Sequence, residues 1–298
     1  MNSSFPVGQI LQPDAVAMKL LVDIEKENPD IADFILKHYQ NLPVDPAVAE
    51  KAYDYLLERS VIFSAMASSH GSSVFTEFLY NGILHPSPAE LYVLECKAGK
   101  AVKSRLMSVE NQLVKIIENL IKGKNKLLIG NFGSGPGRDT IDVLARLRND
   151  LSKIKAIHID KDGAAINRGL LMAKNRGVEK SVQFVHESFM KYNSTEKFDI
   201  IILVGVLCPL NFETCVDVLL AMRKILKTGG LIIASNVTPK MQTEDSFSYF
   251  LMKWLADWKL EFKSPETIQK IFKKAGYKWQ GGFADDFGFH FMGMGNLI

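Results

Sequence analysis

LLIGNFGSGPGRDT, at residues 127–140, joins an apolar run to three alternating glycines and then to the start of a helical pattern. A short, continuous apolar run is typical of a buried strand. Glycine lacks Cβ, so it adopts positive φ and lets the backbone approach a ligand closely. The first N–H groups of a helix have no partner within that helix. The stretch therefore predicts a strand, a tight loop and a helix start that together hold a nucleotide-type cofactor.

The spacing of the glycines narrows the choice of cofactor. The dinucleotide pattern G-x-G-x-x-G, begun at Gly133, needs a third glycine at position 138, where Arg138 stands. The phosphate-loop pattern G-x-x-x-x-G-K-[ST] also fails, because no Lys-Ser or Lys-Thr pair follows the glycines. A G-x-G-x-G run after a strand remains. A plain tight turn could use the same run, so the rest of the chain has to agree.

The following segments continue the alternation of strands and helices. We expect strands over residues 154–160, 182–189, 198–207 and 231–237, and helices over about 163–175 and 212–226, the second closed by Lys-Thr-Gly-Gly at 227–230. Ser264 caps a further helix that has Pro265 at its first position and stops at Gly276. The last two strands, 277–283 and 289–294, flank a turn, which predicts a closing antiparallel hairpin.

In this order, the segments from residue 120 to 298 resemble class I S-adenosylmethionine-dependent methyltransferases. The resemblance implies an α/β fold with a Rossmann-like, mostly parallel sheet closed by a C-terminal antiparallel hairpin, and S-adenosyl-L-methionine as cofactor. Residues 133–139, 233–237 and 254–260 also look like a bacterial branch of small-molecule methyltransferases that includes enzymes forming hydroxy fatty acid methyl esters. Trp254 and Trp258 lie four apart on a presumed helix there, which a stripe facing the core explains equally well.

The resemblance implies a cofactor site at the ends of the strands. Its candidate residues are Asn131, Gly133, Ser134, Gly135, Arg138, Asp139, Asp160, Lys161, Glu187, Ser188, Phe189, Val204 and Gly205. A carboxylate such as Asp160 can accept hydrogen bonds from two ribose hydroxyls, although an Asp there could instead cap the next helix. Glu187, Ser188 and Phe189 are implied around the adenine, and a solvated loop acid is the alternative for Glu187.

Asn131 departs from the family pattern, which often has Asp or Glu two residues before the first glycine. An amide brings no negative charge for the sulfonium or the amino-acid ammonium. We expect either weaker cofactor binding or a charge supplied by Asp139. Arg138 is a candidate for holding the cofactor's carboxylate, and an exposed arginine on the first turn of the helix is the competing interpretation.

Residues 1–120 predict an all-helical N-terminal domain, and residues 121–298 the cofactor-binding domain. Asp45-Pro46 opens a helix through about residue 60, and Ser87-Pro88-Ala89-Glu90 is a capping box that begins a long helical stretch with a break near Gly99. In the family, such a helical region covers the substrate or forms a homodimer; packing for stability alone is the alternative. Candidate polar contacts there are His70, Tyr80 and His85.

Length and composition favour a soluble, cytoplasmic enzyme. The net charge is only +3 and no block of Lys and Arg is long, so we expect no nucleic-acid partner. The three cysteines, Cys96, Cys208 and Cys215, lack metal-ligand spacing and are too few for a disulfide framework, so we expect no metal. Residues 1–6 do not begin a signal peptide, and no apolar run approaches the roughly 20 residues of a membrane span.

Three functions remain open. Methyl transfer to an O, N or C atom of a small molecule, including a carboxyl or hydroxyl group, requires mainly alignment of the acceptor. A base is needed only if the acceptor begins protonated; His290 is one candidate, a core histidine is the competing interpretation, and no catalytic residue is assigned. A nicotinamide-dependent oxidoreductase is disfavoured by Arg138 and the closing hairpin. A non-catalytic cofactor-binding scaffold has Asn131 as its only support.

Overall fold

The computed structural model describes residues 11–68 and 73–298. The described residues form two compact units: 11–68, Phe75–Lys100 and Gln242–Trp258 make the first, and 73–74, Ala101–Met241 and Lys259–Ile298 make the second. This division differs from the domain boundary at residue 120 that we expect from the sequence. The late helix α12 (Ser246–Ala256) groups with the N-terminal helices, while α7 (Lys97–Ile121) continues into the second unit. His70 lies outside the described residues.

All the regular elements among the described residues of the first unit are helices, as expected. Its helices are α1 (Ala15–Glu27), α2 (Pro29–Tyr39), α3 (Pro46–Glu58), α4 (Val61–Ser68), α5 (Ser73–Asn81), α6 (Pro88–Glu95) and α12, with α11 (Lys240–Glu244) at the division between the units. Asp45 caps α3. Ser87 and Glu90 form the expected capping box at the start of α6. Within residues 11–68 and 73–298, no helix combines the length and the apolar character that crossing a membrane requires.

One expectation about this unit was met and another was wrong. The long helical stretch breaks at Cys96, whose backbone is extended, three residues before Gly99. A Cβ at Gly99 would lie 1.9 Å from the Val93 carbonyl oxygen, so this glycine lets α7 start close against α6. Trp258 lies beyond the end of α12 because Asp257 takes a left-handed conformation, φ 43°. Trp254 stacks on Phe250 and therefore packs as an aromatic side chain of this unit.

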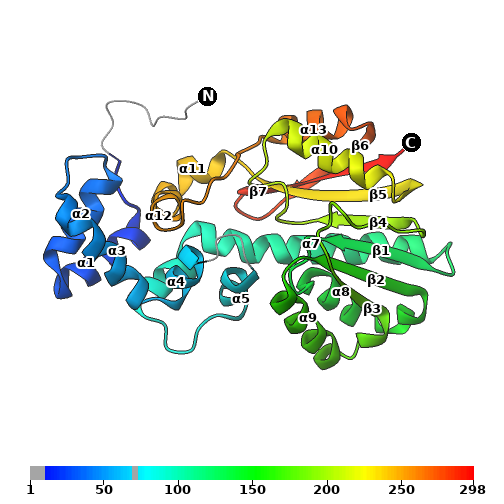
Figure 1. Ribbon diagram of the computed structural model, residues 1–298, viewed down its shortest axis with the longest axis horizontal. Coiled ribbons are helices and arrows are strands. Elements are labelled where there is room, and N and C mark those ends of the chain that lie inside the picture. Colours follow the sequence, from blue (N-terminus) through cyan, green and yellow to red (C-terminus); the bar gives the residue numbers. More distant parts are fainter. Residues whose placement is uncertain (1–10, 69–72) are drawn as a thin grey trace. The chain divides into compact units, whose positions relative to one another are not determined.

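The second unit is a seven-stranded sheet with helices on both faces (Figure 1). Its strands are β1 (Leu127–Phe132), β2 (Ile154–Asp160), β3 (Val182–His186), β4 (Phe198–Leu203), β5 (Leu226–Val237), β6 (Tyr277–Ala284) and β7 (His290–Leu297). The order is β3-β2-β1-β4-β5-β7-β6. The first five strands in this order are parallel, and β7 pairs antiparallel with both β5 and β6. The predicted fold class is confirmed.

Helices cover the sheet in two layers (Figure 1). The helices are α7, α8 (Arg138–Arg146) and α9 (Gly163–Arg176) on one face, and α10 (Phe212–Arg223) and α13 (Pro265–Lys274) on the other, with the 3₁₀ turns η1 (Arg148–Lys153) and η2 (Glu179–Ser181) between elements. Every residue of β1 and β4 is buried, as their continuous apolar runs predict. Full burial of one large apolar side chain contributes about 1.5–3 kcal/mol, so these two layers hold the strand ends in fixed positions.

Several predicted boundaries shift, each for a local reason. β4 ends at Leu203 rather than residue 207, because Gly205 takes φ 82° and turns the chain out of the sheet. β3 ends at His186 rather than residue 189. α10 ends at Arg223, and Gly229, with φ 74°, lies inside β5 rather than at the helix end. The start of α13 at the Ser264 cap is confirmed.

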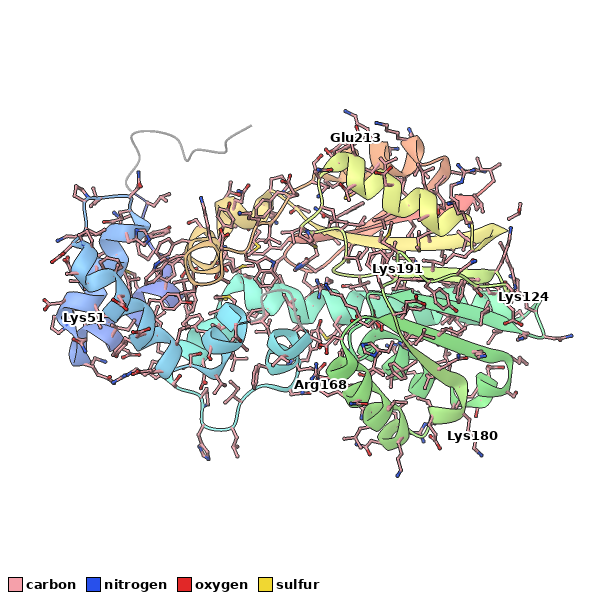
Figure 2. All side chains as sticks on the ribbon, viewed as in Figure 1. Lys51, Lys124, Arg168, Lys180, Lys191 and Glu213 are labelled. Atoms are coloured by element: carbon pink, nitrogen blue, oxygen red, sulfur yellow. The ribbon has the colours of Figure 1, made fainter. Side chains whose placement is uncertain are left out.

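Asp199 fixes the sheet edge opposite the glycine loop. Its side chain is 1% exposed and accepts hydrogen bonds from Lys124 Nζ, Lys227 Nζ (2.8 Å) and Leu128 N (2.9 Å). Figure 2 labels Lys124 beside the start of β1. Burial raises the pKa of Asp199, but the hydrogen bonds from the two lysines outweigh burial and hold it below its usual value. The carboxylate therefore joins β1, β4 and β5 as an ion.

Candidate cofactor-binding site

The strand order reverses between β1 and β4, with β2 and β3 on one side and β5 on the other. In open parallel sheets, ligands bind outside the carboxyl ends of the strands at such a switch point. The glycine loop, residues 133–137, follows β1 at this position. The carboxyl ends of β2, β3 and β4 lie along the same edge because the four strands are parallel.

The glycine loop depends on conformations that favour glycine. Gly133, Gly135 and Gly137 have φ values of 64°, 54° and 73°. A Cβ at Gly133 would lie 2.7 Å from Val206 Cγ2, and one at Gly137 would lie 2.1 Å from Nδ1 of the buried His158. The amide of Gly133 donates to the Ile159 carbonyl oxygen at 2.8 Å, which ties the loop to β2. The loop is therefore a close-packed, left-handed turn.

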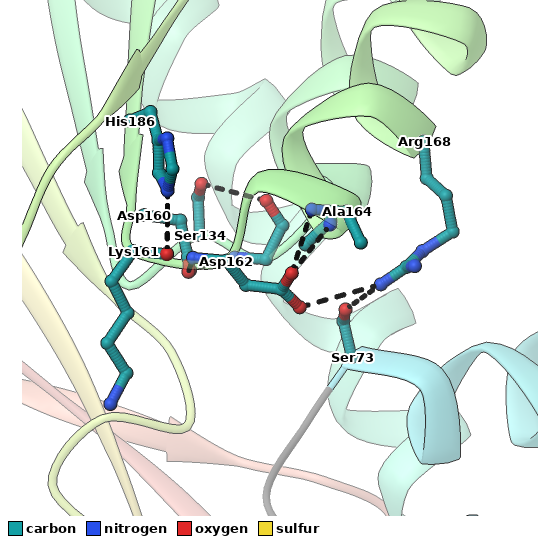
Figure 3. Close-up of polar contacts among 10 residues, drawn as sticks. Ser73, Ser134, Asp160, Lys161, Asp162, Ala164, Arg168 and His186 are labelled. Carbon is teal, nitrogen blue, oxygen red and sulfur yellow. Dashed lines mark hydrogen bonds and ion pairs between the residues drawn. The ribbon is translucent and has the colours of Figure 1, made fainter. Parts of the chain in front are cut away.

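Asp160, at the end of β2, faces this loop (Figure 3). Its Oδ2 accepts from Gly135 N at 2.7 Å, and its Oδ1 accepts from Asp162 N at 2.8 Å. Asp162, not Asp160, caps α9 by accepting from the amides of Ala164 and Ala165. The capping alternative for Asp160 is therefore wrong. A carboxylate has about four lone-pair positions, so Asp160 keeps acceptor capacity beyond these two bonds.

Ser73 packs against the same loop (Figure 3). Arg168 Nη2 on α9 donates to Ser73 Oγ at 2.6 Å and lies 3.8 Å from Asp162 Oδ2. A Cβ at Gly135 would lie 3.1 Å from Ser73 Cβ. The second glycine thus makes room for Ser73 as well as for a left-handed backbone.

Asn131 and Asp139 form a buried pair beneath the loop. Asn131 is 1% exposed, and its Nδ2 donates to Asp139 Oδ1 at 2.7 Å and to Thr140 Oγ1 at 2.9 Å. Burial raises the pKa of Asp139, and the hydrogen bonds from Thr140 and Asn131 act in the opposite direction. An acid at position 131 would face the Asp139 carboxyl group, whereas the amide can donate to it. The amide at 131 and the acid at 139 therefore complement each other.

Arg138 begins α8, and its Nη1 lies 3.8 Å from Asp142 Oδ2. Its side chain is only 15% exposed, so the interpretation as an exposed surface arginine was wrong. The structure places this guanidinium at the first turn of the helix that follows the loop.

The predicted adenine-pocket residues lie just beyond β3. Glu187 has an exposed side chain, and its amide donates to the Asp160 carbonyl oxygen at 2.9 Å. Ser188 and Phe189 are half-buried, and Phe189 Cδ1 would lie 3.9 Å from a Cβ at Gly133. This segment therefore borders both Asp160 and the glycine loop.

The remaining candidates lie along the same edge. Lys161 is exposed, and its carbonyl oxygen lies 2.9 Å from His186 Nε2. Val204 is half-buried, and the exposed Gly205 donates its amide to Ser235 Oγ on β5 at 2.8 Å. Ser134 Oγ donates to the Gly135 carbonyl oxygen at 3.1 Å. The structure thus brings the predicted residues to the carboxyl edge of β1 to β4, with Asn131 and Asp139 buried beneath it.

Sequence reasoning missed two polar groups near this edge. Lys263 is 4% exposed, and its Nζ donates to the Glu261 carbonyl oxygen at 2.8 Å and to the Leu207 carbonyl oxygen and Asn236 Oδ1 at 3.3 Å. No local pattern marks this lysine, because two of its three partners, Leu207 and Asn236, come from other segments. Asp285, which binds His290 Nδ1 at 3.0 Å, was missed too, although an acid opening the hairpin turn was a usable signal.

Residues 127–276 match a family model described as a methyltransferase domain. The match runs along the chain from the start of β1 to just beyond the end of α13, and it includes half of the residues of the chain. The protein therefore belongs to the methyltransferase domain family. No curated protein matches the sequence.

Solved structures share the fold at low sequence identity. A Bordetella parapertussis protein described as a possible exported protein is 15% identical, with a TM-score of 0.71 over 90% of this chain and 96% of its own. Magnesium protoporphyrin IX methyltransferase from Synechocystis PCC 6803, with bound SAH, is 13% identical, with a TM-score of 0.57 over 80% of this chain and 100% of its own. A candidate O-methyltransferase from Nostoc punctiforme PCC 73102 is 12% identical, with a TM-score of 0.55 over 96% and 100%. These similarities establish the fold.

Proposed function

We propose that this protein transfers a methyl group from S-adenosyl-L-methionine to a small-molecule acceptor. The observation that carries the proposal is Asp160, which stands at the strand edge against a three-glycine loop with acceptor capacity left for ribose hydroxyls. Membership of the methyltransferase domain family supports the reaction class. The structural neighbour from Synechocystis was solved with SAH, the product form of this cofactor.

Each part of the edge has a proposed partner on the cofactor. Asp160 receives the ribose hydroxyls, and Glu187, Ser188 and Phe189 surround the adenine. The other proposed contacts are Asn131, Gly133, Ser134, Gly135, Arg138, Asp139, Lys161, Val204 and Gly205, on the methionine side and around the loop. When bound, the cofactor supplies an electrophilic methyl carbon. The protein's own contribution is to align the acceptor with that carbon and to exclude water.

The wider setting of the reaction is also proposed. The helical first unit covers the acceptor or forms a homodimer, and nucleic acid is not a partner, since the net charge is only +3. A cytoplasmic location fits the three buried cysteines, all of which are free thiols.

Calorimetric titration with S-adenosylmethionine, S-adenosylhomocysteine and NAD tests the proposal. We expect the first two to bind and NAD not to bind. Loss of charged hydrogen bonds in Asp160→Ala should weaken binding by about 1.5–3 kcal/mol, roughly 10- to 150-fold. Asp217→Ala, at an exposed position of α10, is the matched control and should bind normally. Binding of NAD alone, or of none of the three, would contradict the proposal.

A further inference from the structure

Asp285 and His290 form a buried pair at the turn between β6 and β7. Asp285 Oδ2 accepts from His290 Nδ1 at 3.0 Å and also from the His290 amide, while Oδ1 accepts from Phe287 N at 2.8 Å. The side chains are 0% and 6% exposed, respectively. The carboxylate therefore fixes both the turn and the orientation of the imidazole ring.

This contact determines which ring nitrogen is free. A neutral imidazole carries one N–H donor and one lone-pair acceptor, so donation from Nδ1 to Asp285 leaves the lone pair on Nε2. Within residues 11–68 and 73–298, Nε2 has no hydrogen-bond partner. Burial lowers the pKa of His290 to about 4, although the hydrogen bond to Asp285 acts in the opposite direction. The ring is therefore a neutral acceptor at neutral pH.

His290 lies at the same sheet edge as the cofactor site. It pairs with Val237, at the carboxyl end of β5, and the neighbouring Thr238 amide donates to the Phe289 carbonyl oxygen at 2.8 Å. The Asp286 amide donates to Ser104 Oγ on α7 at 2.9 Å, which ties the turn to that helix.

The buried Arg105, next to Ser104 on α7, links this corner to the rest of the edge. Burial lowers the pKa of His290, and the positive charge of Arg105 acts in the same direction. Burial raises the pKa of Asp139 at the start of α8 and of Cys208 after β4, and the charge of Arg105 opposes that rise. The guanidinium therefore acts on the helix that follows the glycine loop and on His290 alike.

We propose that His290, oriented by Asp285, is the general base of the reaction and that the acceptor is a protonated hydroxyl group. This inference rests on the proposed methyl transfer. The acceptor oxygen forms a bond to the methyl carbon, and the carbon–sulfur bond breaks with its electron pair on sulfur. The hydroxyl proton passes to Nε2 and then to solvent. A carboxylate acceptor would require no base, so a fixed, neutral imidazole at this edge distinguishes the two acceptor classes.

Two substitutions distinguish the role of His290 as a base from the role of its contact with Asp285 in stabilising the turn. His290→Asn keeps a donor the same number of bonds from the backbone as Nδ1, so it can still bind Asp285, but it lacks Nε2. Asp285→Asn keeps the imidazole but removes the carboxylate that sets its tautomer. Asp217→Asn is the matched control for Asp285→Asn, because Asp217 is exposed on α10 and belongs to no proposed contact.

The test measures SAH release with phenols, aliphatic hydroxy acids and hydroxyl-free carboxylic acids as acceptors. We expect turnover of hydroxylated compounds only. His290→Asn should lower kcat roughly 10²- to 10⁴-fold, with S-adenosylmethionine affinity unchanged, and Asp285→Asn should lower it less. Turnover of hydroxyl-free acids, or a kcat for His290→Asn close to that of the control Asp217→Asn, would overturn the proposal. Absence of cofactor binding would instead refute the proposed function.

A second measurement needs no acceptor. Nitrogen-15 NMR of histidine-labelled protein at pH 7 should show His290 as the neutral tautomer with its proton on Nδ1, and Asp285→Asn should disturb that state. A proton on Nε2, or a charged ring, would remove the lone pair and overturn the assignment of His290 as base.

Discussion

Replacement of Gly137 by alanine tests the steric reasoning behind the glycine loop. Gly137 has φ 73°, a conformation that costs a residue with a Cβ about 1–2 kcal/mol. The new Cβ would also lie 2.1 Å from Nδ1 and 2.4 Å from Cε1 of His158. That ring is fully buried and stacks on Phe184 with centroids 4.7 Å apart, so it has little room to move. Overpacking of this kind costs about 1–3 kcal/mol, so we expect Gly137→Ala to lower the free energy of unfolding by roughly 2–5 kcal/mol.

Gly177→Ala is the matched control, measured by the same urea unfolding. Gly177 has φ 70° but nothing within 4 Å of its Cβ position, so it should cost only the backbone contribution, roughly 1–2 kcal/mol. In a His158→Ala background the steric part should vanish, and Gly137→Ala should then resemble the control. Equal losses for Gly137→Ala and Gly177→Ala in the wild-type background would refute the account of the loop.

Two further predictions concern one partly buried and one buried carboxyl group. Burial, with Asp142 and Asp139 nearby, raises the pKa of Glu110 from 4.5 to about 7, so the native state holds a proton that the unfolded state has released between these values. The free energy of unfolding should therefore fall as pH rises from 4.5 to 7. Glu110→Gln should remove this pH dependence and raise the free energy of unfolding at pH 8 by up to about 3 kcal/mol. Thermal unfolding measured across this pH range checks the prediction, and a pH dependence that is the same in the variant would contradict it. Asp199→Ala should lower the unfolding free energy at pH 7 by roughly 2–4 kcal/mol, because Lys124 and Lys227 lose their shared acceptor. The pKa of Asp199 is lowered in the folded state, so the difference in unfolding free energy between the wild type and Asp199→Ala should shrink only as pH falls below about 4. If the two proteins are equally stable at pH 7, the carboxylate does not hold the strands together.

Much of the sheet could be predicted because a strand that is buried on both faces needs apolar residues at successive positions, which gives a continuous apolar run in the sequence. β2 matches its predicted bounds, residues 154–160, and the Ser264 cap marks the start of α13. Glycine signals were less specific, since Gly229 lies in β5 and not at a helix end. Positive φ suits glycine in either place, and only the sheet partners decide between them.

The positions of site residues were predictable where the order of parallel strands brings them together, and were not predictable where they depend on contacts between segments far apart in the chain. Asp160 ends a strand beside the loop that follows another, so parallel pairing alone brings them together. The pairing of Asn131 with Asp139 spans one loop, and the sequence suggested Asp139 as the source of charge. Ser104 and Asp286 are far apart in the chain, and only the packing of α7 on the sheet brings the Ser104 hydroxyl to the hairpin turn that carries Asp285.

The crystal structure of the protein with S-adenosylhomocysteine tests the central claim most directly. We predict that the ribose hydroxyls bind the Asp160 carboxylate, that the adenine lies beside Phe189, and that the amino-acid end lies against the glycine loop, residues 133–137. A ligand bound elsewhere, or bound here without contact to Asp160, would contradict the assignment of this edge as the methyl-donor site.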